Sequence, residues 1–331
     1  NKIMKKEDIF INSRGGWQPN ERLEFEPIFV WPPQPKKFLK WILEYIWPWN
    51  IFYFLTALLT YLFFQPSIVD MKTFSLDWIS IIFFRNLFLV VFFASLWHLR
   101  LYTFEKQKDK YKFNLRPLSK GRGWLLGTQT RENIFWCVFS AVPIMTAYEV
   151  LLMWAYSNDL LLFSIGNWYD SPFYFCLMFL IIPLWHYFHF FIIHRISHLK
   201  VCYKMFHYLH HKNVNTGPWC GLSMHPIEHI LYFSSLLIHF IIPTHMMHFI
   251  FQSQRTALMA LYGHSGFAEL VINEKTDFTI PHATYFHYLH HKYFECNYGD
   301  LTIPFDKWFG SFHDGSKELH EKLFIKNRKI N

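Results

Sequence analysis

Four long apolar stretches constrain the fold of this chain more than any other feature of its sequence. They lie near residues 41–64, 74–97, 133–156 and 172–193, and each approaches the roughly 20 residues that a helix needs to cross a bilayer. Because lipid offers no hydrogen-bond partners, a spanning segment must satisfy its backbone groups within itself or within a closed barrel. The pattern therefore predicts an all-α integral membrane protein with about four transmembrane helices.

The composition agrees with one polytopic membrane domain. Hydrophobic residues make up 52% of the 331 residues and charged residues only 17%, and the charges gather in blocks between the apolar stretches. The net charge of +8 comes from Lys and Arg that flank these stretches, which favours contact with anionic lipid headgroups and argues against nucleic acid as a partner. The five cysteines form no CxxC pair, so no disulfide framework is expected.

The loops predict an orientation. The connection 98–132 contains nine Lys or Arg residues against three acids, whereas the connection 157–171 contains none and has Asp159 and Asp170. By the positive-inside rule, the first loop, the N-terminus and the region just after residue 193 then face the cytosol or its equivalent. Two further apolar stretches, about 230–251 and 256–272, have Pro243-Thr244-His245 between them and predict a helical hairpin that dips into the membrane.

Shifts in composition divide the chain into four parts. Residues 1–40 are polar and basic and predict an interfacial arm. Residues 41–134 contain the first membrane helix pair and the basic loop, residues 135–315 contain the remaining apolar stretches and the histidine motifs, and residues 316–331 form a polar tail. We expect the histidine-rich part to form a helical cap on the inner, cytosolic face.

The 20 histidines are concentrated after residue 185 and recur at helical spacing. The motifs are HRISH at 194–198 and HYLHH at both 207–211 and 287–291. Composition alone predicts only roughly 0.07 HxxHH motifs in such a chain, so two of them are specific evidence. On a helix, positions i, i+3 and i+4 share a face. The imidazoles expected to converge on one centre by this spacing are His194, His198, His207, His210, His211, His287, His290 and His291.

Eight or more imidazoles are too many for one metal ion, so the motifs predict two. Imidazole suits iron, zinc and copper. A structural zinc site normally has four ligands, often with cysteine, and the cysteines here lack ligand spacing, so redox iron fits better. Isolated histidines in apolar surroundings are more often packing residues than ligands. We therefore leave the following outside the site: His186, His189, His239, His245 and His248.

Several motifs together resemble those of a known family. They are HRISH, the first HYLHH, HPIE at 225–228, HSG at 264–266 and the segment HYLHHKYFECNYGDLTIPFDKWFGSF at 287–312. This pattern is similar to that of the fatty acid hydroxylase superfamily, more narrowly its sterol desaturase and sterol methyl oxidase branch, over about residues 135–315. Many members have a histidine just before the last box, where this chain has Phe286, and the nearest upstream imidazole is His282.

The resemblance implies a di-iron centre at the cytosolic membrane face that uses O2 to remove hydrogen from an unactivated C–H bond of a lipid. Electrons would come from a b-type cytochrome or an NAD(P)H reductase, and zinc could replace the two Fe ions in a purified sample. His225 is a weaker candidate ligand, and Glu228, Asp300 and Asp306 are candidates for orienting ligand histidines or for turn and surface roles. The ligands carried over by position are His194, His198, His207, His210, His211, His264, His287, His290 and His291.

The resemblance leaves three functions open. The first is a desaturase or hydroxylase acting on a sterol, and the second is a hydroxylase acting on a fatty acid, sphingolipid or alkylglycerol. The third is a family member without activity that serves as a structural subunit beside other membrane subunits. The ending Arg328-Lys329-Ile330-Asn331 resembles a dilysine retrieval signal and favours the endoplasmic reticulum, with the mitochondrial inner membrane as the alternative.

Two ionisable residues lie within the apolar stretches. Arg85 falls in the second stretch and Glu149 in the third, at similar predicted depth and far from the histidine motifs. Neither charge is stable in hydrocarbon without a partner, so the two are expected to pair and to clamp the helices together.

Overall fold

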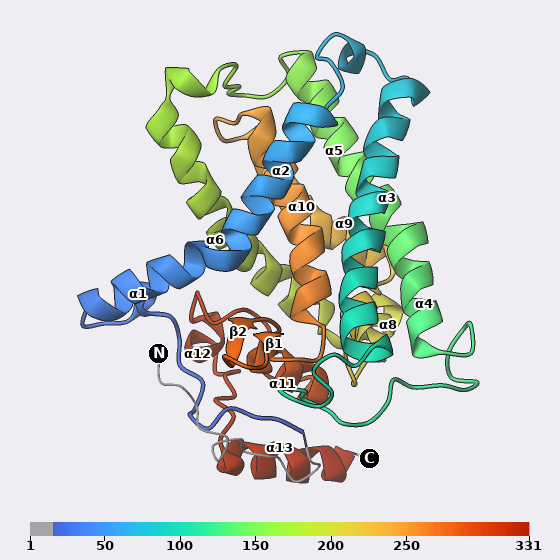
Figure 1. Cartoon of the computed structure of the whole chain (residues 1–331), viewed down its shortest axis with the longest axis vertical. Helices are drawn as coiled ribbons and strands as arrows, with labels where there is room; N and C mark the ends of the chain where they lie inside the picture. The colour runs from blue at the N-terminus through green and yellow to red at the C-terminus, as the bar shows by residue number, and fades with distance from the viewer. Residues whose placement is uncertain (1–15, 331) are drawn as a thin grey trace.

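The computed structural model describes residues 16–330, with side chains through residue 323, and it is mainly helical (Figure 1). The longer helices are α1 (Pro35–Tyr45), α2 (Ile51–Phe63), α3 (Leu76–His98), α4 (Gln129–Trp136), α5 (Val142–Ser157), α6 (Pro172–Ser197), α9 (Pro226–Phe233), α10 (Met246–Gly263), α11 (Tyr285–Tyr293) and α13 (Lys317–Ile330). The short ones are α7 (Lys200–Cys202), α8 (Tyr208–His211) and α12 (Phe305–Trp308). The predicted helical class is confirmed, with one addition: β1 (Glu269–Asn273) and β2 (Phe278–Pro281) form an antiparallel pair.

Four helical segments are long and apolar enough to cross a membrane, and they coincide with the four predicted stretches. They are Pro35–Phe63, Leu76–Thr103, Gln129–Ser157 and Pro172–Ser197. Large apolar side chains point outward from them, including Phe84 at 63% exposure and Phe139 at 69%. An apolar outer surface of this kind is stable against lipid rather than water.

The first segment changes direction between α1 and α2. Trp47 has extended backbone angles there, as expected for a residue that precedes a proline, because the Pro48 ring disfavours the helical conformation before it. As a result α1 runs away from the bundle while α2 joins it (Figure 1).

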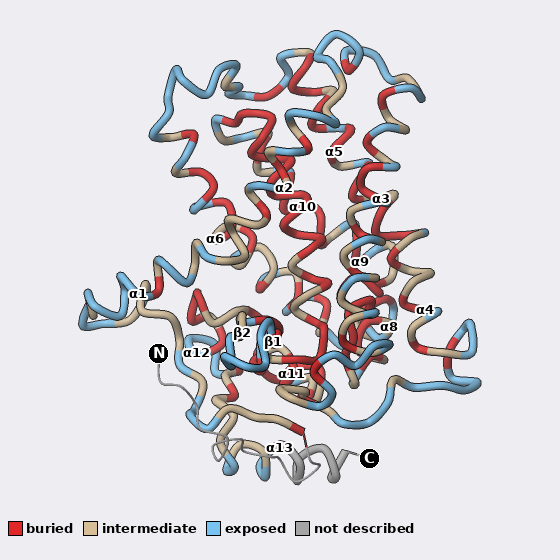
Figure 2. The backbone as a smooth tube through the Cα atoms, in the orientation of Figure 1, coloured by how far each residue is buried: buried red, intermediate tan, exposed pale blue. Residues whose placement is uncertain are grey.

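Helix α10 is the central helix of the bundle and is almost entirely buried (Figure 2). It packs against α2, α3, α5 and α6. It also follows the predicted turn at 243–245, after α9 and a short 3-10 segment, Ser234–Phe240. The predicted second leg, 256–272, is therefore corrected: the helix begins at Met246 and ends at Gly263.

The correction has a clear physical cause. The polar run 252–255, which interrupts the apolar pattern, lies inside α10 because each polar side chain meets a partner from the surrounding chain, and buried polar groups are stable when they are hydrogen-bonded. The bonds are Gln252 Nε2 to Ser235 O at 3.0 Å, Ser253 Oγ to Glu149 Oε1 at 2.6 Å, Gln254 Nε2 to Thr60 Oγ1 at 2.7 Å, and Arg255 Nη2 to the Tyr187 hydroxyl at 2.8 Å.

The predicted Arg85–Glu149 pair is confirmed. The Arg85 guanidinium on α3 contacts the Glu149 carboxylate on α5, and both side chains are buried, at 5% and 0% exposure. Arg85 Nη2 also donates to Asn86 Oδ1 at 3.0 Å. Because Glu149 accepts from Ser253 as well, the pair joins α3, α5 and the central helix α10.

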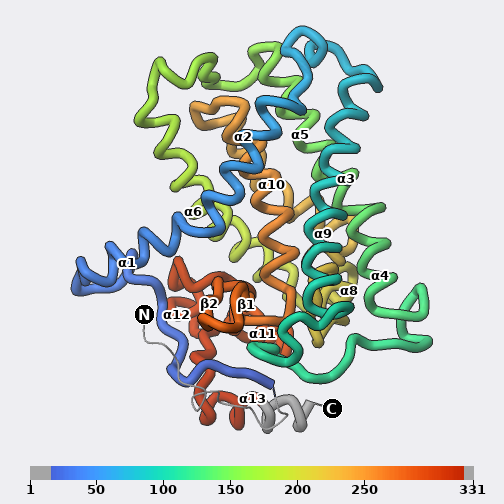
Figure 3. The backbone as a smooth tube through the Cα atoms, viewed as in Figure 1, coloured from blue at the N-terminus to red at the C-terminus, as the bar shows by residue number. Residues whose placement is uncertain are grey.

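The cap comprises residues 16–34, the loop 104–128 and residues 264–323, and it lies at one end of the bundle (Figure 3). The predicted arm is part of it: Trp17 N donates to Lys112 O at 2.7 Å and Leu23 N to Asp314 O at 2.8 Å. The Trp17 ring also packs on Tyr285 of α11. Residues 1–15, residue 331 and the side chains of the Arg328-Lys329-Ile330-Asn331 ending lie outside the described residues.

Candidate metal centre

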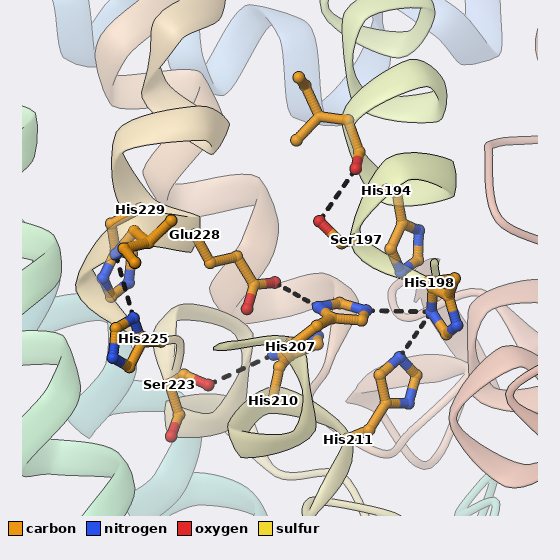
Figure 4. A network of polar contacts seen from close by, with 12 residues as sticks. His194, Ser197, His198, His207, His210, His211, Ser223, His225, Glu228 and His229 are labelled. Carbon is orange, nitrogen blue, oxygen red and sulfur yellow. Dashed lines mark hydrogen bonds and ion pairs between the residues drawn. The ribbon is translucent and has the colours of Figure 1, made fainter. Parts of the chain in front are cut away.

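Four segments bring histidines together where the bundle meets the cap. Helix α6 provides His194 near its end and His198 just after it, and the segment 203–211 provides His207, His210 and His211. His264 directly follows α10, and α11 provides the last three, at 287, 290 and 291. Figure 4 shows the first two segments, with His198, His207 and His211 pointing toward one another.

The histidines form two groups in which the potential ligand atoms all lie within 4.8 Å of one another. One group has five members, His194, His198, His207, His211 and His290, and the other has four, His210, His264, His287 and His291. All nine residues named from the family motifs are in these groups. Neither group contains a cysteine or a carboxylate, so both offer only imidazole nitrogens.

The spacing within the five-membered group suits a metal ion better than hydrogen bonds. The Nε2 atom of His198 lies 3.0 Å from those of His207 and His211 and 3.2 Å from that of His290, and the last two lie 3.0 Å apart. One Nε2 has either one proton or one lone pair, so it cannot bond to three others. Two nitrogens bound to one ion at right angles stand roughly 3.0 Å apart, against about 3.4 Å in a tetrahedron, for bonds of about 2.1 Å.

The four-membered group is similarly close. The Nε2 atom of His264 lies 2.7 Å from that of His287 and 3.1 Å from that of His291. In both groups, therefore, the Nε2 atoms face inward from different elements. Their lone pairs would repel one another without a positive charge between them, so the donor set fits a cation in each group.

Oxygen atoms hold the outer nitrogens and thereby fix the tautomer. An oxygen of a carbonyl or carboxylate accepts, so Nδ1 carries the proton and Nε2 keeps its lone pair for metal. These outer contacts of Nδ1 are His194 to Tyr298 O at 2.6 Å, His207 to Glu228 Oε1 at 2.7 Å, His264 to Ala260 O at 2.8 Å, His290 to Cys296 O at 2.6 Å and, more weakly, His210 to Ser223 O at 3.4 Å.

The NYG motif shapes the loop that supplies two of these carbonyls. The buried Asp306 carboxylate accepts from Tyr298 N at 2.9 Å, Gly299 N at 2.8 Å and the Ser311 hydroxyl at 2.6 Å. Glycine is needed at 299 because a Cβ there would lie 3.1 Å from the Phe191 ring and 3.2 Å from Asp306 Oδ2. Asp306 thus acts through the loop, and not on a histidine directly.

Glu228 is the candidate carboxylate that contacts a histidine directly. Its Oε1 meets His207 Nδ1, and both residues are buried. We expect Glu228→Gln to keep this hydrogen bond but lose the negative charge, and to weaken metal binding about 10- to 100-fold. Competition with a chelator measures the change, and Glu274→Gln on the exposed surface is the matched control. Equal affinities in the parent and in Glu228→Gln would rule out this role.

Several other histidines lie outside both groups. His225, the weaker candidate ligand, is in neither group, and its Nδ1 accepts from Ile227 N at 3.2 Å and caps α9. Figure 4 shows it beside His229, away from the converging rings. Phe286 is buried and stacks toward Phe312, and His282 lies between Trp49 and Trp97, so neither reaches the centre. The five histidines set aside from the sequence are in neither group: His186, His189, His239, His245 and His248.

Burial keeps the clustered imidazoles neutral, which leaves them free to bind metal. It lowers the pKa of His207 to about 3 and that of His264 to about 4. Burial, with neighbouring imidazoles adding to it, also lowers the pKa well below the usual value for His210, His211, His287, His290 and His291.

These shifts predict that the metal-free protein loses stability in acid. Below about pH 6.5 the unfolded chain takes up protons at His207 and His264, whereas the folded chain does not until about pH 4 or lower. The free energy of unfolding should then fall by up to about 1.4 kcal/mol per pH unit for each such histidine. Unfolding of chelator-treated protein at pH 7.5 and 5.5 measures this, and His207→Gln should reduce the dependence. A free energy that is flat over this range contradicts it.

A cavity adjoins both groups. It is bounded on one side by histidines of the two groups, among them His194, His210 and His287, and elsewhere by apolar side chains such as Phe190 and Met259. Tyr187, Tyr262 and Asp300 are among its other polar lining residues, with Ser197, Glu228, Tyr232 and Thr284. A mostly apolar cavity with a few polar groups beside a reactive centre is the usual form of a small-molecule site.

The fold and the centre define a helical membrane protein with two polyhistidine groups suited to metal. The Fatty acid hydroxylase family model matches residues 175–311, which include all nine clustered histidines. Over this segment the chain is similar to the fatty acid hydroxylase family, and it also matches curated sterol desaturases.

Three curated relatives that match the chain are sterol desaturases or a probable one. A Delta(7)-sterol 5(6)-desaturase of Gibberella zeae is 30% identical over 39% of this chain and 36% of the relative. A probable Delta(7)-sterol 5(6)-desaturase of Neurospora crassa is 27% identical over 72% and 63%, respectively, and a Delta(7)-sterol 5(6)-desaturase of Candida albicans is 26% identical over 41% and 33%. The chain therefore matches between about one third and 63% of the length of these relatives. No solved structure matches the chain.

Proposed function

We propose that the chain is an oxygen-dependent di-iron desaturase or hydroxylase that acts on a sterol. The observation that supports this most strongly is the pair of adjacent imidazole groups, with five and four members, at the edge of a largely apolar cavity. Five nitrogens around one point exceed the four of a tetrahedral zinc site, and their right-angle spacing favours iron. Each group would then hold one Fe ion, through the nine histidines named above.

The iron pair would supply the activation of O2 and the removal of hydrogen from an unactivated C–H bond. Residues of the chain orient the histidine rings and exclude water from the metal centre. Glu228 and the carbonyls of Cys296 and Tyr298 fix the histidine rings, while Phe190 lies against His194 and His287 with ring centres 4.8 and 6.4 Å away. Excluding water strengthens electrostatic interactions and protects the reacting species.

The substrate and the cellular setting follow from the relatives and the charge pattern. The three relatives are named for desaturation of a sterol, which supports a sterol substrate over a fatty acid, sphingolipid or alkylglycerol. The basic loop 98–132 supports a cap on the cytosolic side. We place the protein in the endoplasmic reticulum, where a b-type cytochrome or an NAD(P)H reductase would deliver electrons. The alternative is a subunit without activity in a larger, mitochondrial assembly.

Metal analysis and sterol profiling together test this proposal. We expect about two iron ions per full-length chain and an accumulating sterol precursor in cells that lack the protein, which disappears when the parent gene is restored. A purified chain without iron, in cells whose sterols are unchanged by its loss, would favour the subunit role. Changed fatty acids or sphingolipids with unchanged sterols would move the proposal to the other substrates.

A further inference from the structure

A buried cation, Arg255, contacts Tyr187, which lines the cavity. Arg255 of α10 is 2% exposed and makes no ion pair with any carboxylate in the described part of the chain. Its Nε donates to Asn50 Oδ1 at 3.1 Å, its Nη2 donates to the Tyr187 hydroxyl at 2.8 Å, and the guanidinium lies over the Tyr187 ring. Burying a charge without a paired anion costs free energy. The position of Arg255 against Tyr187 therefore needs an explanation.

Tyr187 lies between the Arg255 guanidinium and the cavity. Its hydroxyl accepts from Arg255, so its own proton points to another acceptor, and among the described residues no hydrogen bond donated by Tyr187 is found. Tyr187 lines the cavity. A hydroxyl that accepts from a cation is a stronger donor, because hydrogen bonds in a chain polarise one another.

Asp300 supplies an acceptor in the same cavity wall. Its Oδ1 accepts from Thr302 N at 2.8 Å, and the residue lines the cavity beside Gly299. Burial raises the pKa of the Asp300 carboxyl, and the nearby Arg255 charge opposes that shift. Both residues line the cavity, and the Asp300 charge acts on the Tyr187 hydroxyl, so the wall offers a donor and an acceptor with a negative charge that disfavours anions.

The distance to the histidines follows from helix geometry. Tyr187 and His194 are both on α6 and are separated by seven residues, or two turns, which is roughly 10 Å along the helix axis. Phe190 and Ile193, which also line the cavity, lie between them on the same helix. A ligand in the cavity can therefore lie along this face of α6, between the histidines and Tyr187.

We propose that Tyr187 and Asp300 form a subsite for the hydroxyl group of a lipid alcohol. Tyr187 donates to the alcohol oxygen and Asp300 accepts its proton, so one neutral hydroxyl satisfies both residues, whereas a carboxylate or phosphate is repelled by Asp300. The subsite rests on the function proposed above and deepens it: Tyr187 and Asp300 select a lipid with a neutral hydroxyl group over an acyl chain that ends in a carboxylate.

Equilibrium binding to the purified full chain in nanodiscs tests the subsite without any turnover. The probes are cholest-7-en-3β-ol, the same sterol with hydrogen in place of the hydroxyl, and oleate. The parent should bind the alcohol at least about tenfold more tightly than the deoxy sterol, which corresponds to one charge-assisted hydrogen bond. Tyr187→Phe should reduce this preference several-fold, the double variant Tyr187→Phe with Asp300→Asn should bring it near unity, and Asp300→Asn alone should tighten the binding of oleate. The matched control is Tyr174→Phe on the same helix, whose hydroxyl donates to Pro243 O at 2.7 Å.

The outcomes separate this inference from the proposed function. Equal binding of the alcohol and the deoxy sterol by the parent, or an unchanged preference in Tyr187→Phe, overturns the subsite even if the protein oxidises sterol. A clear preference that Tyr187→Phe reduces and the double variant removes supports the subsite even if no iron or oxidised sterol is found. Tighter binding of oleate than of the alcohol by the parent also overturns it, because Asp300 should exclude a carboxylate.

Discussion

Replacement of His290 by alanine is expected to abolish lipid oxidation and to lower the iron content from about two ions per chain toward one. The Nε2 atom of His290 lies 3.0 to 3.2 Å from those of His211 and His198, so its loss opens the five-membered group. Losing only an outer partner of a ligand typically costs 10- to 100-fold, and losing the ligand should cost more than about 100-fold. Membrane insertion should persist, because it depends on the apolar spans.

Iron per chain and oxidised sterol, measured side by side in parent and variant, test this expectation. His225→Ala is the matched control, because His225 caps α9 and lies outside both groups. It should lose about 1 kcal/mol of stability as a cap but retain iron. Unchanged product in the His290 variant would remove His290 from the centre, and loss of iron in the His225 variant would contradict the two groups as described.

Replacement of Arg85 by methionine should destabilise the bundle by about 3–5 kcal/mol, because it leaves the Glu149 carboxylate buried without its cation. Glu149 would retain only the Ser253 hydroxyl, which donates at 2.6 Å. The double variant Arg85→Met with Glu149→Gln should recover much of the loss, since it removes both charges.

Reversible unfolding in mixed micelles measures these differences. Lys72→Met, which removes an exposed cation, is the control and should change stability by less than about 0.5 kcal/mol. If the single and double variants lose the same free energy, the cost does not come from an unpaired charge. The pair would then be a packing contact and not an electrostatic clamp.

The sequence predicted those parts of the structure that depend on local periodicity. Spans appear as long apolar stretches, and the motifs HRISH and HYLHH place imidazoles on single helix faces. By contrast, the residues that orient His194 and His290 act through the backbone carbonyls of Tyr298 and Cys296, and any residue type has such a carbonyl. The NYG motif was the only sequence signal for that loop.

The errors arose where tertiary contacts override a local pattern. The polar run 252–255 broke the apolar period, yet it continues α10 because four surrounding segments supply its partners. His225 was a weaker candidate because of its place in the HPIE motif, and the structure shows it before the proline at the first position of α9, where it caps the helix. Arg255 was missed as a site residue, although a charge within an apolar stretch is itself a signal.

The polar contacts of α10 also determine when this helix can enter the membrane. Gln252, Gln254 and Arg255 would each meet hydrocarbon if α10 left the ribosome and moved into lipid alone, and an Arg at the centre of a span is strongly disfavoured there. Their partners lie on chain synthesised earlier, including Thr60, Asn50 and Tyr187. We therefore expect α10 to enter the bundle only after α2 and α6 have assembled around an open centre. The central helix is then the last helix to join the bundle. Because His264 directly follows α10, and His287 and His291 come later still in the chain, the four-membered histidine group can form only after α10 is in place.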